Sequence, residues 1–537
     1  MANVTEALAS SGVFDQYLSK HLPAATAGFV FILFAWLAQS FFKNDPLANV
    51  PVVGGQGGAW KKRKEFAAGK GSDYYIEGYR KFKDSIFRVS TLRKRDTICV
   101  PPKYLPELRK LPDDVLSFDA AIHESMQVKY TKIESDTPLV VHTVKASLTP
   151  ALRRLPIIFK SIIARLNALI SDEVVESMRL ELPQSTEWTE VNINSKLLRI
   201  IAMASGRVFI GPELCRDERY LDASINYTID LMTAVHVVAF LPGPLRPILA
   251  RFLPQVKQLN RRIAEAEAVF RPIVDARKQA KAAGGDDYQE PDDMLQWMMN
   301  AQSKFGQSTN RQLAQNQLGI SFAAIHTTSL TTTNALYWLA AKPELIPILR
   351  DDVQQALLES GGQFSSPALQ GMKKLDSFLR EVLRCSPLGA GSFSRKVLKA
   401  IKLPNGQVIP PDNVIEIPAG GVNLDDEIFP DAEVFDALRY YKLRQAKDAA
   451  ESGSKAAEVV ANSQFVSVGT SHLTFGYGRH ACPGRFFAVN EIKMIMANIL
   501  CNYEIKLPDG VTERYENIKF GAGSVPDPTK TVMIRKI

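Results

Sequence analysis

The sequence predicts a mainly α-helical protein with small β-sheets, preceded by one N-terminal transmembrane helix. Apolar residues recur at helical spacing through most of residues 155–235, and residues 310–340 form a long apolar helical stretch. Alternating apolar residues are confined to short stretches such as Ile86–Val100 and Leu403–Ile417, which is typical of small hairpins. Residues 22–42 carry no charge. Helices therefore dominate the predicted fold, and the strands can form only small sheets.

The uncharged N-terminal segment is long enough to cross a membrane. A helix of about 20 apolar residues spans a hydrocarbon core of roughly 30 Å, and residues 22–42 meet that length. A cleaved signal peptide is the alternative, but the apolar run is too long and no basic region precedes it. Positive charge follows instead, at Lys43 and over residues 61–64, so the positive-inside rule places the rest of the chain in the cytosol. We therefore expect a short segment at 1–21, an anchor at 22–42 and a linker rich in proline and glycine at 43–70.

Composition limits the class of protein. The chain has 537 residues, 46% of them hydrophobic, so it can bury a large core. Its net charge of +8 is spread along the chain, which does not indicate nucleic-acid binding but suits a basic patch facing an acidic protein or anionic lipid. The five cysteines show no paired spacing. This pattern favours a reduced, cytosol-facing domain without a disulfide framework or zinc site.

A glycine-rich loop around Cys482 carries the strongest chemical signal. Glycines surround the cysteine in the stretch 475–488, and Pro483 suits the first position of the apolar helix that follows. A sulfur at a helix N-terminus is favoured as a thiolate, which can act as a metal ligand or a nucleophile. The alternative is a buried structural cysteine. The flanking residues Phe475, His480 and Gly484 favour the first interpretation, because together with Cys482 they match the motif of a known protein family.

The loop resembles the heme-binding loop of the cytochrome P450 family, F-x-x-G-x-[RH]-x-C-x-G. The resemblance implies that Cys482 is the axial thiolate ligand of the iron of heme b, and that Phe475, His480 and Gly484 belong to the cofactor-binding loop. It also implies that residues 71–537 fold as one heme-thiolate monooxygenase domain of the cytochrome P450 fold.

The long apolar helix carries Phe322-Ala-Ala-Ile-His-Thr-Thr-Ser329, which resembles the family's central motif [AG]-[AG]-x-[DE]-T-[TS]. Ala323 has no bulk and lets the helix pass close to a flat cofactor. The threonines compete for backbone carbonyls, so we expect the helix to open locally. Thr327 stands at the position of the family's oxygen-activating threonine. His326 replaces the usual acid; an imidazole can relay protons near neutral pH, although a core histidine is the alternative.

Other family positions also have counterparts. Glu381 and Arg384 lie at i and i+3 on one helix face and can pair, and Arg439 matches the third member of a structural Glu–Arg–Arg network. Arg395 aligns with an arginine that binds a heme propionate. Lys145 stands at the second propionate position, where the family usually has arginine; a lysine can neutralise a propionate as a point charge, and a surface lysine is the alternative.

Two further stretches bear on the setting of the enzyme. Val237–Leu249 contains three prolines and a glycine yet remains apolar, so it is either a membrane-contact loop or a buried turn. The stretch Pro101–Thr131 resembles fungal members of the family such as ent-kaurene oxidases.

Together these features predict a membrane-anchored heme monooxygenase. The resemblance implies O2 as oxidant, electrons supplied from NADPH through cytochrome P450 reductase, and cytochrome b5 as a further candidate partner. The expected substrate is a lipophilic small molecule, a terpenoid or related fungal secondary metabolite. The expected location is the endoplasmic reticulum membrane, single-pass, with the catalytic domain facing the cytosol. A heme-thiolate isomerase and a non-catalytic heme sensor are the alternatives.

Overall fold

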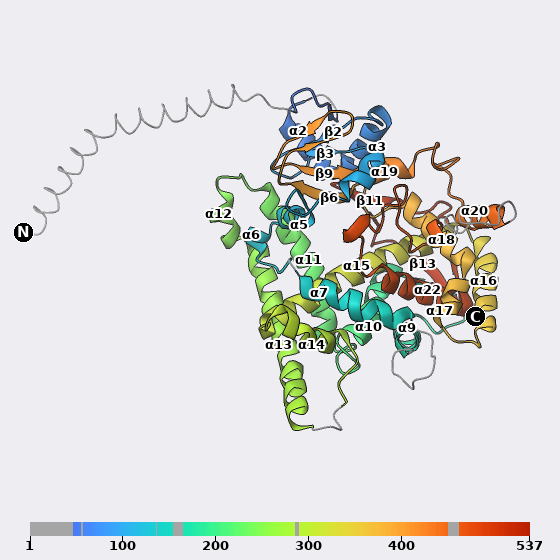
Figure 1. Cartoon of the computed structure of the whole chain (residues 1–537). Helices are drawn as coiled ribbons and strands as arrows, with labels where there is room; N and C mark the ends of the chain where they lie inside the picture. Colours follow the sequence, from blue (N-terminus) through green and yellow to red (C-terminus); the bar gives the residue numbers. More distant parts are fainter. Residues whose placement is uncertain (1–46, 55–56, 136, 154–164, 285–288, 449–460) are drawn as a thin grey trace, which may run out of the picture. The chain divides into compact units, whose positions relative to one another are not determined.

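The computed structural model describes residues 47–54, 57–135, 137–153, 165–284, 289–448 and 461–537. Contacts divide the chain into two units, Met1–Pro51 and Val52–Ile537. The predicted anchor at 22–42 lies outside the described residues. The second unit consists of a β-rich part beside a larger group of helices (Figure 1).

The helical part contains most of the secondary structure. Its longer helices are α3 (Gly71–Lys81), α5 (Phe118–Ser125), α9 (Arg165–Glu181), α10 (Ile193–Phe209), α11 (Glu218–Phe240), α13 (Pro254–Ala283), α14 (Met294–Phe305), α15 (Asn310–Ala341), α16 (Leu345–Glu359), α18 (Lys373–Cys385), α20 (Arg439–Asp448) and α22 (Arg485–Asn502). The shorter helices are α2 (Ala59–Glu65), α4 (Leu105–Leu108), α6 (Val128–Thr131), α7 (Pro138–Thr143), α8 (Thr149–Arg153), α12 (Arg246–Leu249), α17 (Ser366–Gly371) and α19 (Ala419–Asn423). Short π- and 3-10 turns link them: η1 (Phe66–Lys70), η2 (Pro102–Tyr104), η3 (Val144–Leu148), η5 (Ala250–Phe252) and η7 (Gly478–His480).

In the described part of the chain, the strands form one sheet of six and three smaller sheets. In the largest sheet the order is β1-β2-β3-β9-β6-β4, and the strands are β1 (Val52–Val53), β2 (Phe87–Val89), β3 (Thr97–Cys99), β4 (Leu116–Ser117), β6 (Ser392–Val397) and β9 (Val414–Ile417). The smaller sheets contain β5 (Thr189–Val191), β10 (Tyr503–Lys506) and β13 (Val532–Lys536), then β7 (Ile401–Lys402) with β8 (Val408–Ile409), and β11 (Asn517–Phe520) with β12 (Gly523–Pro526).

The predicted fold class is confirmed: the unit is mainly helical with small sheets. The predicted first hairpin is present as the antiparallel pair β2 and β3. The second is shorter than predicted, because β7 pairs with β8 whereas β9 joins the large sheet. The predicted linker at 43–70 contains β1, α2 and η1, and Gly69 of η1 packs against the carbonyl of Lys519 in β11. Ordered elements therefore begin before residue 71.

Helix α15 passes through the middle of the core. Thr309 caps its first turn, accepting from the Gln312 backbone N–H while the Gln312 side chain accepts from the Thr309 N–H. The helix packs against α10, α11 and α13, and apolar residues of these elements form one continuous core with α18 and α22. Burial of such a continuous apolar surface is the main favourable term in folding. The core thereby holds the central helix and the cysteine helix at fixed positions.

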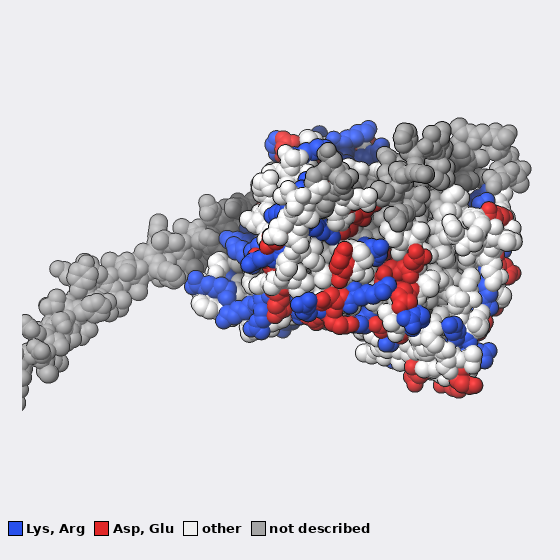
Figure 2. All heavy atoms as spheres, turned by 90° about the horizontal axis from the view of Figure 1, so that it is seen from below, with Lys and Arg blue, Asp and Glu red and all other residues white. Residues whose placement is uncertain are grey.

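Among the described residues, α11 is long and apolar enough to cross a membrane by length and composition. Its contacts with α10, α13 and α15 are those of a core helix. On the face of the molecule shown in Figure 2, basic and acidic side chains are interspersed. The excess of basic residues is therefore not gathered into one patch on that face.

Candidate active site

Cys482 lies in a tight turn between η7 and α22. The Cys482 backbone N–H donates to the Phe475 carbonyl at 2.8 Å, which closes the loop. Gly476 and Gly478 both adopt φ of 72°, a conformation that glycine takes without strain. Burial raises the pKa of the Cys482 thiol, whereas the backbone N–H groups of Gly484 and Arg485 lower it. A bound metal cation would deprotonate such a thiol.

The surroundings of Cys482 determine what kind of metal site is possible. The described part of the chain contains no group of three or more His, Cys, Asp or Glu side chains that could hold a metal ion. All five cysteines are free. A heme-thiolate centre needs a single cysteine from the protein, and the surroundings of Cys482 fit that requirement.

The buried Arg395 fits the acidic groups of a heme. Its residue is 4% exposed, and its guanidinium donates to the Ser394 carbonyl and lies over the rings of Phe118 and Phe393. Burial, and then the nearby charge of Arg479, lower its pKa to about 10. Within the residues that the structure describes, Arg395 forms no ion pair. A buried cation needs a counter-charge, and a heme propionate would supply one.

His480 lies beside this arginine. Arg395 and His480 line the same small crevice, and the His480 ring stacks on Phe118 with 5.1 Å between ring centroids. The Nε2 atom of His480 lies 3.1 Å from the Asp113 carboxylate, and Arg479 pairs with that carboxylate at 2.8 Å. Burial lowers the pKa of His480, although Asp113 opposes this effect. Asp113 and Phe118 thus hold the His480 ring in place, although no sequence motif identified them.

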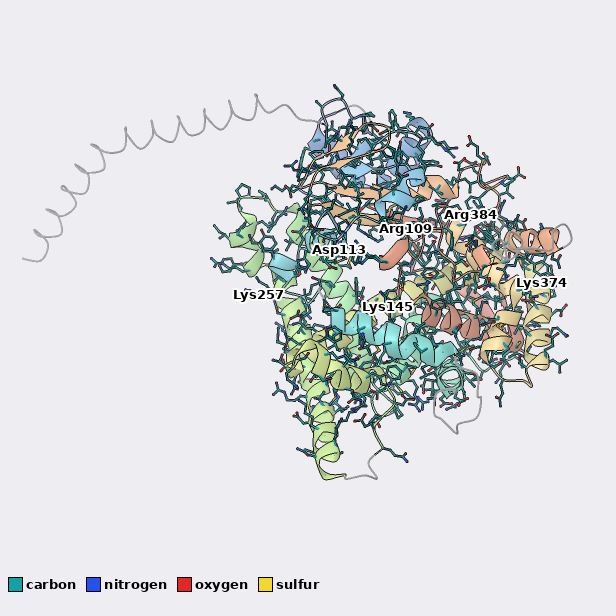
Figure 3. All side chains as sticks on the ribbon, viewed as in Figure 1. Arg109, Asp113, Lys145, Lys257, Lys374 and Arg384 are labelled. Carbon is teal, nitrogen blue, oxygen red and sulfur yellow. The ribbon has the colours of Figure 1, made fainter. Side chains whose placement is uncertain are left out.

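Lys145, the second predicted propionate ligand, lies in the π-helix η3 and is exposed. No ion pair of Lys145 occurs among the described residues. In the view of Figure 3, Arg109, Asp113 and Lys145 lie in the middle of the domain, between the β-rich part and the helices. The side chain is free to reach an acidic group there.

The central helix presents one open face. Ala323 and Thr327 are exposed, whereas the neighbouring Ile325 and Thr328 are buried. The Thr327 hydroxyl donates to the Ala323 carbonyl at 2.7 Å. The expected local opening is absent, because α15 is continuous across this stretch. The Thr327 hydroxyl bonds back to the helical backbone without breaking the helix. The small residues on this face still leave room for a flat cofactor.

His326 is directed to another helix. Its Nε2 atom lies 2.8 Å from the Ile225 carbonyl of α11. Because a carbonyl can only accept, this nitrogen carries the hydrogen, and the second nitrogen is an acceptor in the neutral ring. Burial lowers the pKa of His326, and the bond to Ile225 opposes the shift. The residue therefore joins α15 to α11 while it keeps one nitrogen for proton exchange.

Glu381 holds two arginines behind the cysteine loop. Its carboxylate is fully buried and accepts from Arg384 at 2.7 and 2.9 Å and from Arg439 at 3.1 Å. Arg384 also donates to the carbonyls of Asn423 and Val434. The guanidinium groups thus bind the backbone of the segment that leads toward the loop of Cys482.

Comparison with known proteins decides the family. The family model for cytochrome P450 matches residues 121–533. The cytochrome P450 monooxygenase ATR3 of Stachybotrys chlorohalonatus is 42% identical over 446 residues, 83% of this chain and 90% of the relative. The chain belongs to the cytochrome P450 family. The cytochrome P450 monooxygenases braC of Annulohypoxylon truncatum and AN1598 of Emericella nidulans are 33% and 34% identical, over 96% and 86% of this chain and 97% and 82% of the relatives.

As a cytochrome P450 monooxygenase, the protein takes a heme with a cysteine thiolate ligand. The arrangement around Cys482 fits that cofactor, because the cysteine loop and the buried Arg395 line one crevice, and α15 contacts α22, the helix that follows the loop. The family's acid in the central helix is replaced by His326, whose ring bonds to α11. No sequence motif could predict that partner, since Ile225 contributes only its backbone carbonyl.

Proposed function

We propose that the protein is a membrane-bound monooxygenase that oxidises a lipophilic small molecule, a terpenoid or related fungal secondary metabolite. The observation that carries this proposal is the open face of α15, where Ala323 and Thr327 are exposed beside the buried Ile325 and Thr328. An apolar substrate beside this face would lose contact with water. The surrounding core is apolar, which favours a lipophilic ligand over a charged one.

The chain's own residues position the substrate and deliver protons. The heme, when bound through Cys482, supplies the activation of O2 with two electrons. Thr327 offers a hydroxyl on the open face, now held by the Ala323 carbonyl, and can rotate to donate to a ligand. His326 can take up a proton at the nitrogen that Ile225 leaves free and pass it on, so that it relays protons from the α11 side. The buried core around α15 restricts the access of other water.

Electrons would come from NADPH through cytochrome P450 reductase, with cytochrome b5 as a second donor. The basic residues Arg109, Lys110 and Arg479 line one pocket together with Tyr477 and Gly478 of the cysteine loop. A basic surface at this place attracts an acidic partner and brings it near the thiolate ligand.

We further propose that residues 22–42 anchor the protein in the endoplasmic reticulum membrane, with the catalytic domain in the cytosol. The region after α11 supports a second contact with lipid. Large apolar side chains are exposed there, at Phe240, Leu245, Ile248, Leu249 and Phe252. Exposed apolar groups of this kind favour a membrane surface over water.

The test of the reaction is the variant Thr327→Ala with purified reductase. Thr327→Ala removes the hydroxyl but leaves the backbone of α15 intact, so heme loading and ligand binding should persist. We expect NADPH to be consumed with loss of most product and release of hydrogen peroxide, because proton delivery fails. His326→Ala should reduce the ratio of product to NADPH less, since water can replace an imidazole.

Wild-type coupling in Thr327→Ala would refute the assigned proton route. The wild-type protein itself separates the alternatives: an isomerase turns over without reductase, and a sensor consumes no NADPH in the presence of any ligand tested. Product formation that depends on NADPH and reductase supports the monooxygenase.

A further inference from the structure

His236 is a polar side chain near the end of α11. Its ring is half-buried and packs against Phe520 of β11, with 6.3 Å between the ring centroids and an edge-on angle of 67°. The Nδ1 atom lies 2.7 Å from the Met232 carbonyl, one turn earlier in the same helix. Because a carbonyl can only accept, Nδ1 carries the hydrogen, and Nε2 is an acceptor in the neutral ring. Within the described residues, no protein group donates to Nε2.

The face of α11 that carries His236 also passes the central helix. Ile225, Ile229, His236 and Phe240 are spaced by four, seven and four residues, which places them along one side of the helix. At one end of this stripe the Ile225 carbonyl bonds to His326 of α15. Ile229 is 53% exposed and Phe240 is 47% exposed. The stripe is thus an open apolar surface with one imidazole, and it begins beside the proposed proton donor.

The hairpin of β11 and β12 closes the other side. The Ala390 N–H donates to the Ala522 carbonyl at 2.8 Å, and the Ser524 N–H donates to the Leu388 carbonyl at 3.1 Å. These bonds attach the hairpin to the segment just before β6, the strand that carries Arg395. Phe520 at the end of β11 is 38% exposed. The His236–Phe520 contact joins α11 to the hairpin, and α15 contacts both α11 and β12. His236 and Phe520 therefore lie where α11 meets the hairpin, and both of these elements contact the central helix.

We propose that the Nε2 atom of His236 accepts a hydrogen bond from a hydroxyl group of the substrate, so that the substrate is a lipophilic molecule that already carries one hydroxyl. The inference rests on the proposed function, because it assigns the chemistry of the substrate to the same site. A lipophilic ligand lying against the stripe would cover the Nε2 atom and keep water from such a bond, and an acceptor covered in this way discriminates between ligands with and without a donor. The hydroxyl would be held near the hairpin, away from Thr327. His236 would thus determine which carbon of the substrate faces the open part of α15.

The test uses matched ligands with the heme-loaded protein. Each set contains a terpene hydrocarbon, its alcohol and the methyl ether of that alcohol, and farnesene, farnesol and farnesyl methyl ether form the first set. Equilibrium dialysis and the spectral change on binding measure the dissociation constants. For at least one skeleton, the wild type should bind the alcohol about five- to tenfold more tightly than the ether, the effect of one hydrogen bond from a neutral donor.

Three variants separate recognition from packing. His236→Leu keeps an apolar side chain against Phe520 but removes the acceptor, so alcohol and ether should bind equally. His236→Gln places an amide oxygen near the position of Nε2 and should restore the preference for the alcohol. His142→Leu is the matched control, because His142 is also half-buried and packs against an aromatic ring, that of Phe305 in α14. It should keep the wild-type preference.

The outcomes distinguish this inference from the proposed function. Binding of terpenoids without any preference for alcohols, or an unchanged preference in His236→Leu, overturns the role of His236 and leaves the proposed substrate class in place. Equal loss of preference in the His142→Leu control also overturns it, since the effect is then not specific to Nε2. If no terpenoid of any set binds, the proposed substrate class fails and the inference fails with it.

Discussion

Glu491 offers a test of how burial controls stability around the cysteine helix. This residue lies two turns into α22 and is fully buried against α10. One carboxyl oxygen accepts from the Ser205 hydroxyl at 2.8 Å, and the other has no hydrogen-bond partner among the described residues. Burial raises the pKa of Glu491 to about 8 from an ordinary value of 4.5. The folded protein therefore keeps this carboxyl protonated at neutral pH.

The sign of the pH dependence follows from this shift. Above pH 4.5 the unfolded chain releases the proton of Glu491, whereas the folded protein holds it until about pH 8. The unfolded state thus binds fewer protons, and the free energy of unfolding falls as the pH rises through this window. At about 1.4 kcal/mol for each pH unit, the loss is on the order of 4 to 5 kcal/mol. Above pH 8 the loss should be constant.

Glu491→Gln removes the titrating group and keeps an oxygen for the Ser205 hydroxyl. Urea unfolding of the heme-loaded protein, followed by circular dichroism from pH 5 to pH 9, gives the free energy of unfolding for wild type and variant. The variant should gain stability relative to the wild type as the pH rises, by about 3 to 5 kcal/mol in total. Glu513→Gln, at an exposed position, is the control and should follow the wild-type profile. Parallel profiles for wild type and Glu491→Gln would show that Glu491 is ionised in the folded protein, and the reasoning would fail.

Three further variants test the site. Cys482→Ser should abolish the absorption of the reduced, CO-bound protein at about 450 nm, which is typical of a thiolate-ligated heme. A variant that keeps this band would contradict the ligand assignment. Glu381→Ala leaves Arg384 and Arg439 without their buried carboxylate and should cost about 3–5 kcal/mol; normal thermal stability and heme content would show that the ion pairs are dispensable. Deletion of residues 1–43 should release most of the protein from membranes in carbonate washes, and retention equal to that of the intact chain would place the anchor elsewhere.

Local sequence patterns were enough to predict the structural features that depend on neighbouring residues. The glycines and the proline around Cys482 lie within a few residues of it, so the turn and the start of α22 could be predicted from the sequence. Glu381 and Arg384 are three residues apart on one helix, and their spacing alone places them on a common face. The long apolar run of α15 likewise predicted a central helix, because its composition is incompatible with an exposed position.

The sequence by itself therefore determined the helical fold class, the cysteine loop and the approximate ends of α15, which arise from interactions over a few residues. Only the tertiary structure decided which distant groups meet: Asp113 with His480, Ile225 with His326, and Phe520 with His236. It also decided that β9 joins the large sheet and that Glu491 meets the Ser205 hydroxyl rather than a cation among the described residues. The physical reason is that burial and hydrogen bonding depend on residues hundreds of positions apart, and a backbone carbonyl such as that of Ile225 has no sequence identity that a motif could record.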